Sequence, residues 1–188
     1  MNKSILIAIA CCVIPLAIIG FILLSGGERI DHSTMPGWTD KTKVQIGTSV
    51  GDSAPDFQLT DIDGKLLSKS SFKDKPLLIW FTTTYCVPCQ VGAEEVKRLD
   101  ADMGGNVFNV MMVFIDQREE LVDLYGWKVN FGNEDWYIAR GHDQLIQDYQ
   151  IRFLDTQYLL DRDGVIRNFD NSYVGYEVYK SKIQSLIQ

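Results

Sequence analysis

Apolar and polar residues follow one another along this chain in blocks that predict alternating strands and helices. The apolar run 76–84 is too short for a helix and ends in three threonines, so it predicts a buried strand. The run 107–116 predicts a second buried strand. Between the two, apolar positions recur at spacings of three and four, which predicts a helix that begins at the cysteines. The apolar face of that helix comprises Cys89, Gly92, Val96, Leu99 and Met103.

The rest of the pattern predicts two hairpins and three more helices. Short apolar stretches flank Asp63-Gly64, which indicates an early hairpin with a two-residue turn, and 156–170 indicates a late hairpin that turns at Asp163-Gly164. Helices are expected at 118–125, at 143–149 with Asp143 as N-cap, and at the C-terminus. The last helix would carry one apolar stripe of Tyr179, Ile183, Leu186 and Ile187. This order predicts an α/β fold with a central sheet, a parallel βαβ unit and helices on both faces.

The N-terminus has a different pattern. No charge falls between Lys3 and Glu28, and the apolar run 5–24 would extend about 30 Å as a helix, enough to cross a bilayer. We therefore expect a transmembrane anchor over 1–25 that contacts the lipid bilayer through 5–24, and Lys3 favours a domain outside the cytoplasm. Two alternatives are a cleaved signal peptide that ends near "LLSGG" and a lipoprotein modified at Cys11.

Composition limits the organisation and the partners of the rest. Residues 26–50 are polar and lack periodicity, which predicts a tether, and 51–188 suffice for a single cored domain. The formal net charge is −7, and the acidic residues are scattered along the chain. Such a surface does not suit nucleic acid or anionic lipid.

The four cysteines divide into two groups. Cys11 and Cys12 lie in the apolar N-terminal run, and Cys86 and Cys89 are the only cysteines in the predicted domain. Outside the cytoplasm, a domain that needed disulfide cross-links would normally contain several cysteine pairs. A single pair at CxxC spacing is better explained by a chemical role of the thiols than by structural cross-linking.

The CxxC pair lies where the first buried strand ends and a helix begins. Free backbone N–H groups and the helix dipole at that point favour the thiolate of Cys86, which we predict to be the nucleophile. Cys89, one turn later on the same face, could resolve a mixed disulfide formed at Cys86. Pro88 fits the first turn, where its missing N–H costs nothing.

Two segments, "FTTTYCVPC" (81–89) and "YLLDRDGVI" (158–166), together with the early hairpin, resemble the membrane-anchored, extracytoplasmic TlpA/ResA-like branch of the thioredoxin superfamily. The likeness covers about residues 50–188. It implies a thioredoxin-like fold, with a central mixed sheet flanked by helices and an added N-terminal β-hairpin. It also implies disulfide reduction or exchange, often during cytochrome c maturation. The expected partners are protein thiol or disulfide substrates and a membrane redox partner that recharges a redox-active Cys86–Cys89 disulfide, with no cofactor.

Three positions depart from the pattern of that family. Tyr85 replaces the usual Trp before the first cysteine. Gly92 replaces a buried Glu, so no residue is assigned to the general-acid role that this Glu has in the family. Asp155 stands where relatives have a cis-proline. A cis bond before a non-proline residue costs about 3 kcal/mol, so we expect a trans or differently shaped loop there. A carboxylate facing the thiols would also raise their pKa. The predicted active-site loop comprises Tyr85, Val87, Pro88, Asp155 and Thr156.

Other functions remain open at this point. Cys86, Cys89 and Asp155 could bind a soft metal, as in Sco-type copper chaperones, although those use a downstream His and none stands at 153–155. A thiol peroxidase is a weaker alternative, because Thr83 stands three residues before Cys86 as in peroxiredoxins but Ile79 replaces their proline. A zinc site is disfavoured, since zinc takes four ligands.

Overall fold

The computed structural model describes residues 44–187. They form an α/β unit with a mixed five-stranded sheet in the order β5-β4-β3-β6-β7 and a separate two-stranded sheet of β1 and β2. Strands β3, β4 and β5 are parallel, whereas β6 runs antiparallel to β3 and to β7. In chain order the elements are β1 (Gln58–Thr60), β2 (Leu66–Ser68), η2 (Lys69–Phe72), β3 (Leu77–Thr82), α2 (Val87–Asp102), β4 (Asn109–Phe114), α3 (Leu121–Phe131), β5 (Tyr137–Arg140), α4 (Asp143–Asp148), β6 (Thr156–Leu160), β7 (Ile166–Asp170) and α5 (Tyr176–Ile187).

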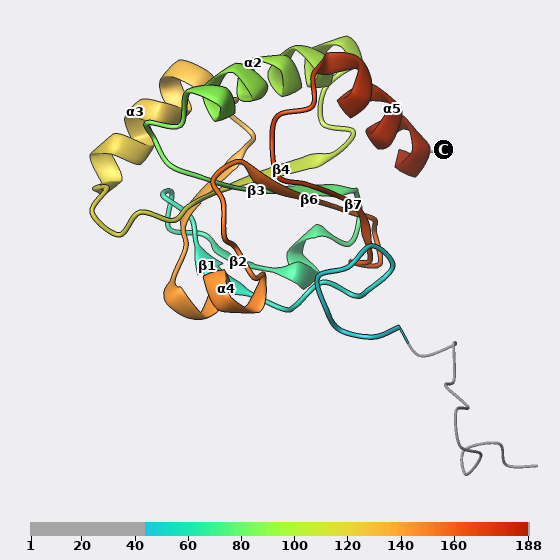
Figure 1. Cartoon of the computed structure of the whole chain (residues 1–188). Coiled ribbons are helices and arrows are strands. Elements are labelled where there is room, and N and C mark those ends of the chain that lie inside the picture. Colours follow the sequence, from blue (N-terminus) through green and yellow to red (C-terminus); the bar gives the residue numbers. More distant parts are fainter. Residues whose placement is uncertain (1–43, 188) are drawn as a thin grey trace, which may run out of the picture. The chain divides into compact units, whose positions relative to one another are not determined.

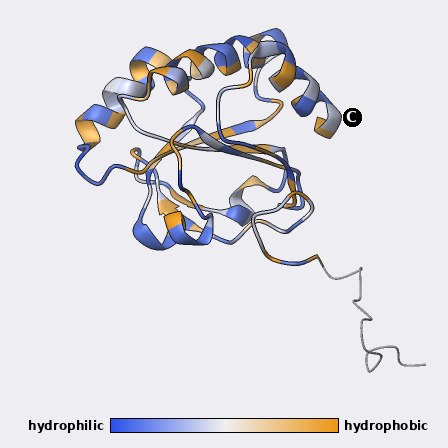
Figure 2. Ribbon diagram, in the orientation of Figure 1, coloured by the Kyte–Doolittle hydropathy of each residue, from blue (hydrophilic) through white to orange (hydrophobic). Residues whose placement is uncertain are grey.

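Helices and hairpin cover the two faces of the large sheet. Figure 1 shows α2, α3 and α5 on one face and α4 with the β1–β2 hairpin on the other. In Figure 2 the central strands are largely apolar, whereas the helices carry apolar and polar residues on different sides. The predicted central mixed sheet flanked by helices, with an added early hairpin, is confirmed.

Strand β3 lies at the centre of the sheet, and all six of its residues are buried. Because successive side chains of a strand point to opposite faces, β3 contributes to both halves of the core. Leu78 and Trp80 belong to the half beneath α2, with the two cysteines. Leu77, Ile79 and Phe81 belong to the half beneath the hairpin.

Both hairpin turns are longer than a two-residue turn. In the first, Asp61 N donates to Lys65 O and Gly64 N donates to Asp61 O, each at 3.0 Å, so three residues form the loop. Gly64 has a φ of +83°, which glycine adopts without steric cost. The second turn repeats this pattern between Asp161 and Val165. The expectation of a two-residue turn at Asp63-Gly64 is therefore wrong.

The pattern also missed or misplaced some elements. Strand β5 pairs with β4, but only its two central residues are buried, so it lacks the long apolar run that marked β3 and β4. Helix α3 runs past Gly126 to Phe131, because Trp127 is buried in the core. The N-cap of α4 is His142, whose Nδ1 accepts from Leu145 N at 3.2 Å, and not Asp143.

Across residues 44–187 no helix combines the length and the apolar character needed to cross a membrane. The predicted anchor at 1–25 and most of the predicted tether lie outside the described residues. Near its start, the described chain already contacts the domain, since Ser53 N donates to Gln45 O at 2.7 Å and Gly51 N donates to Ile166 O at 2.8 Å.

Candidate active site

The cysteine pair lies at the junction between β3 and α2. Cys86 is the N-cap of α2, and Pro88 falls within the first two helical positions, as predicted. Cys86 N donates to Thr83 O at 3.2 Å, and Cys86 O accepts from Gln90 N at 3.0 Å. Among the described residues no side chain caps this helix end. The positive end of the helix therefore faces the first cysteine sulfur.

Cys86 and Cys89 form a disulfide, with their Cα atoms 5.3 Å apart. Cys86 is 7% exposed, whereas Cys89 is fully buried. Solvent and partner molecules thus reach the first cysteine more readily than the second. The structure is that of the oxidised pair, and it matches the predicted disulfide.

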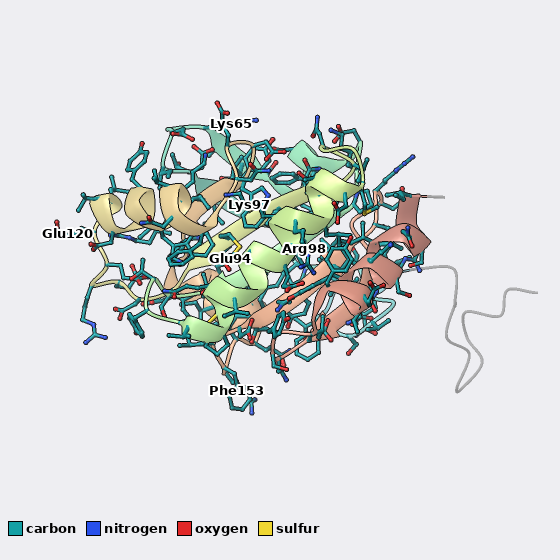
Figure 3. The ribbon with its side chains drawn as sticks, turned by 90° about the horizontal axis from the view of Figure 1, so that it is seen from above. Lys65, Glu94, Lys97, Arg98, Glu120 and Phe153 are labelled. Carbon is teal, nitrogen blue, oxygen red and sulfur yellow. A yellow bond between two sulfur atoms is a disulfide. The ribbon has the colours of Figure 1, made fainter. Side chains whose placement is uncertain are left out.

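An open cavity of about 650 Å³ lies beside Cys86. Its apolar part is exposed: Tyr85 is 57% exposed, Val87 63% and Leu154 38%. Phe153, next to this wall, is 62% exposed, and Figure 3 shows it reaching away from the body of the domain. The cavity is lined by Tyr85, Cys86, Val87, Pro88, Leu154, Asp155, Asn171, Ser172 and Tyr173.

The loop before β6 faces the cysteine pair across this cavity, and Asp155 is its central residue. Residues 44–187 contain no cis peptide bond, as we expected for this loop, and Asp155 has a φ of +65°. Its N–H donates to Phe81 O at 3.1 Å. Thr156 does not line the cavity. It is buried, and its hydroxyl donates to Phe153 O at 2.8 Å, which fixes the loop from below.

The carboxylate of Asp155 is buried and fully engaged. Its Oδ1 accepts from Trp80 Nε1 at 2.8 Å and from Gln157 Nε2 at 3.0 Å, and its Oδ2 accepts from Tyr173 N at 2.6 Å. In residues 44–187 no group of three or more His, Cys, Asp or Glu side chains is arranged to hold a metal ion. The structure thus brings Asp155 to the same cavity as Cys86, and the two cysteine sulfurs that the alternative metal site would use are joined in the disulfide.

Side chains of neighbouring residues fill the space beside Gly92. A Cβ there would lie 2.5 Å from Cη2 of Trp80 and 3.0 Å from Cδ2 of Tyr173. The indole of Trp80 therefore occupies the space that a side chain on this turn of α2 would need. Thr83, on which the peroxidase alternative rested, is buried at the end of β3, and its Oγ1 has no hydrogen-bond partner in the described part of the chain.

Sequence reasoning missed the loop between β4 and α3, which supports the CxxC loop. Tyr85 OH donates to Asp116 Oδ2 at 2.9 Å, and Thr84 N donates to Glu119 Oε1. Asp116 also forms an ion pair with Arg118, whose hydrogen bonds hold the pKa of that carboxyl well below its usual range. Carboxyl ends of neighbouring parallel strands meet at one edge of a sheet, so the position of "IDQREE" directly after β4 was the available signal.

Comparison with known proteins agrees with this geometry. The model of the AhpC/TSA family matches residues 50–169, which is more than half of the chain. The chain belongs to the AhpC/TSA family. Among its family relatives it is 24% identical to the thiol-disulfide oxidoreductase ResA of Geobacillus thermodenitrificans, over 79% of this chain and 82% of that protein. It is 30% identical to the thiol:disulfide interchange protein DsbE of Vibrio cholerae, over 89% and 84%.

Solved structures support the fold of this AhpC/TSA family member. A thiol:disulfide interchange protein of the thioredoxin family from Chlorobium tepidum superposes with a TM-score of 0.64 at 18% identity, over 72% of this chain and 96% of that one. A thioredoxin-like protein from Aeropyrum pernix gives a TM-score of 0.62 at 17% identity, over 69% and 89%. The fold is thioredoxin-like. With the Cys86–Cys89 disulfide in place, the chain is a thiol-disulfide oxidoreductase of the ResA and DsbE type.

Proposed function

We propose that this protein exchanges disulfides with other proteins, with Cys86 as the attacking and Cys89 as the resolving cysteine. The observation that carries the assignment is the difference in access, because Cys86 opens to the cavity and Cys89 is fully buried. The N-terminal end of α2 points at Cys86 and favours its thiolate. Tyr85, Val87 and Pro88 shape the loop around that sulfur.

The reaction in the reducing direction has two steps. The Cys86 thiolate attacks one sulfur of a substrate disulfide, which forms a mixed disulfide and releases the other substrate sulfur as a thiolate. The Cys89 thiolate then attacks Cys86 Sγ, which restores the Cys86–Cys89 disulfide and releases the second substrate thiolate. The protein loses two electrons, the substrate gains them, and the two protons of the dithiol pass to the substrate thiolates. A partner dithiol recharges the pair by the reverse exchange.

The surface around Cys86 favours protein substrates. Tyr85, Val87 and Leu154 form an exposed apolar rim of the cavity, and the exposed Phe153 precedes Leu154 in the chain. An extended peptide with apolar side chains next to its cysteine can cover this rim and exclude water from the reacting sulfurs. A small soluble disulfide would leave most of it exposed.

We further propose that the domain works outside the cytoplasm, tethered to the membrane by residues 5–24. The support is the uncharged apolar run of membrane-spanning length with Lys3 before it. The full-length chain should remain in the membrane fraction, and protease added outside sealed cells with a permeable wall layer should digest the domain. Protection from the protease, or release of a soluble form that begins near Ser25, would contradict the tether.

Insulin reduction with dithiothreitol as terminal reductant tests the catalytic assignment. The test uses full-length chains in which Cys11 and Cys12 are replaced by Ser. In this background Cys86 and Cys89 are the only thiols of the chain that can reduce insulin. On that background the unaltered pair should accelerate insulin precipitation, and the Cys86→Ser variant should fall to the uncatalysed rate. Urea unfolding of both proteins controls for the fold. Equal rates in the two proteins would refute the proposed function.

A further inference from the structure

Three features occur together at Asp155. It is a carboxylate, it is only 6% exposed, and its backbone has a φ of +65°. Asn and Gly adopt that conformation at least as readily as Asp, and neither carries a charge. The backbone shape of the loop therefore does not explain why a charged residue stands at this position.

All three side-chain contacts of Asp155 are made by donors. Trp80 Nε1 comes from β3, Gln157 Nε2 from β6, and Tyr173 N from the segment between β7 and α5. An ionised carboxylate accepts at every position and donates at none, so this set of partners suits the anion. Donors from three segments hold the carboxylate in one place.

The residue that carries the charge shares a cavity with the redox pair. Asp155 and Cys86 line the same cavity, and Trp80, which binds the carboxylate, packs in one core cluster with both cysteines. Around the cavity and its base lie other groups that bear or can bear charge. Tyr85 and Tyr173 line the cavity, and Glu119 accepts from Thr84 N of the CxxC loop. The others are Tyr179, whose hydroxyl donates to Gln157 Oε1 at 2.9 Å, the Asp170–Lys182 ion pair and the Asp116–Arg118 ion pair. Each of these ion pairs contains its own countercharge, whereas the contacts of Asp155 come from neutral donors.

We propose that Asp155 is a positioning residue whose fixed negative charge favours the disulfide over the reduced thiolate form of Cys86 and Cys89. An anion held near a thiol opposes the formation of a second anion there. The reduced pair is then less stable at neutral pH, so it donates electrons more readily. This inference rests on the proposed function and adds the direction in which the site is tuned, toward reduction of substrates.

Two variants remove the charge without straining the backbone. Asp155→Asn keeps an oxygen acceptor for Trp80, and Asp155→Gly suits the positive φ even if the side-chain contacts are lost. Both would be made on the background that lacks Cys11 and Cys12. Glu94→Gln is the matched control, because Glu94 is a carboxylate on the exposed side of α2, the helix that carries Cys89 (Figure 3).

Two measurements test the charge. The rate at which iodoacetamide alkylates the reduced pair, followed against pH, should have its midpoint about one pH unit lower in Asp155→Asn and Asp155→Gly than in the parent. The equilibrium with glutathione should shift roughly tenfold toward the dithiol, which corresponds to about 30 mV. Asp155→Glu keeps the negative charge, so its alkylation midpoint should stay close to that of the parent. Glu94→Gln should leave the midpoint unchanged.

The outcomes separate this inference from the proposed function. If the parent fails to reduce insulin, the proposed function is wrong. If the parent reduces insulin but both charge-removing variants keep the parent midpoint and equilibrium, Asp155 acts only in the fold and the inference is wrong. Failure of both variants to fold would equally make Asp155 a structural residue and refute the inference.

Discussion

Single residues beneath the cysteines show how closely this site is packed. Trp80 is fully buried, and its indole lies against position 92 on α2. Because Gly92 has no side chain, α2 can lie this close to β3. That approach places both the disulfide and the Trp80–Asp155 hydrogen bond at the same end of the sheet.

Gly92→Ala should destabilise the domain. Its Cβ would lie 2.5 Å from Cη2 of Trp80, so the buried indole or the helix must shift, and overpacking of this kind costs about 1–3 kcal/mol. Gly126→Ala in α3 is the matched control, since a Cβ there meets nothing within 4 Å. At that exposed helical position alanine should stabilise the domain by about 0.5–1 kcal/mol. Urea unfolding checks both values, and equal effects at the two positions would contradict the packing argument.

Among single residues, the sequence predicts the relation of those that lie close together in the chain. Cys86, Pro88 and Cys89 could be assigned from spacing, because one helical turn fixes their relation. The partners of Asp155 could not, since Trp80 and Tyr173 come from segments 75 and 18 residues away. The same is true of Asp116 and Glu119, which meet the CxxC loop only because β4 lies beside β3.

The two ends of helix α2 differ in how their charged groups interact with the helix dipole. Its N-terminus carries Cys86, but its last turn contains Asp100 and Asp102 and no basic residue. Negative side chains there oppose the helix dipole. Burial, and then the charge of Asp135, raise the pKa of Asp100 above its ordinary range.

Asp100→Asn should therefore stabilise the domain at neutral pH. A carboxyl whose pKa is raised by folding contributes most when it is protonated, below its unfolded pKa, and that contribution is lost as the pH rises through the folded pKa. Removing the charge from the last turn should increase the free energy of unfolding by about 0.3–1 kcal/mol at pH 7. Near pH 3 the two proteins should be almost equal. Urea unfolding at both pH values measures the difference, and a loss of stability in Asp100→Asn at pH 7 would contradict this reasoning.

Element type was predictable where a long periodic or apolar run existed, as for β3, α2 and β4. It was not predictable for β5, whose four residues become a strand because they pair with β4. The start of α3 was also missed, since Arg118 and Glu119 are used by the loop that supports the cysteines.

For the whole molecule, the topology explains why the site forms at this edge of the sheet. Strand β3 has a parallel neighbour on one side and an antiparallel neighbour on the other. The end of β3, the end of β4 and the start of β6 therefore meet at one edge. These three places carry the CxxC loop, its supporting carboxylates and Asp155.

The most direct test of the account is the reaction of each cysteine alone with Ellman's reagent, on the background that lacks Cys11 and Cys12. The reduced Cys89→Ser variant should react through Cys86, release one thionitrobenzoate and retain the other as a stable mixed disulfide visible by mass spectrometry. The reduced parent should release two, because Cys89 resolves the adduct. The Cys86→Ser variant should react at least roughly tenfold more slowly, since Cys89 is fully buried. Faster reaction at Cys89, or an adduct that persists in the parent, would contradict the assignment of Cys86 as nucleophile and Cys89 as resolving cysteine.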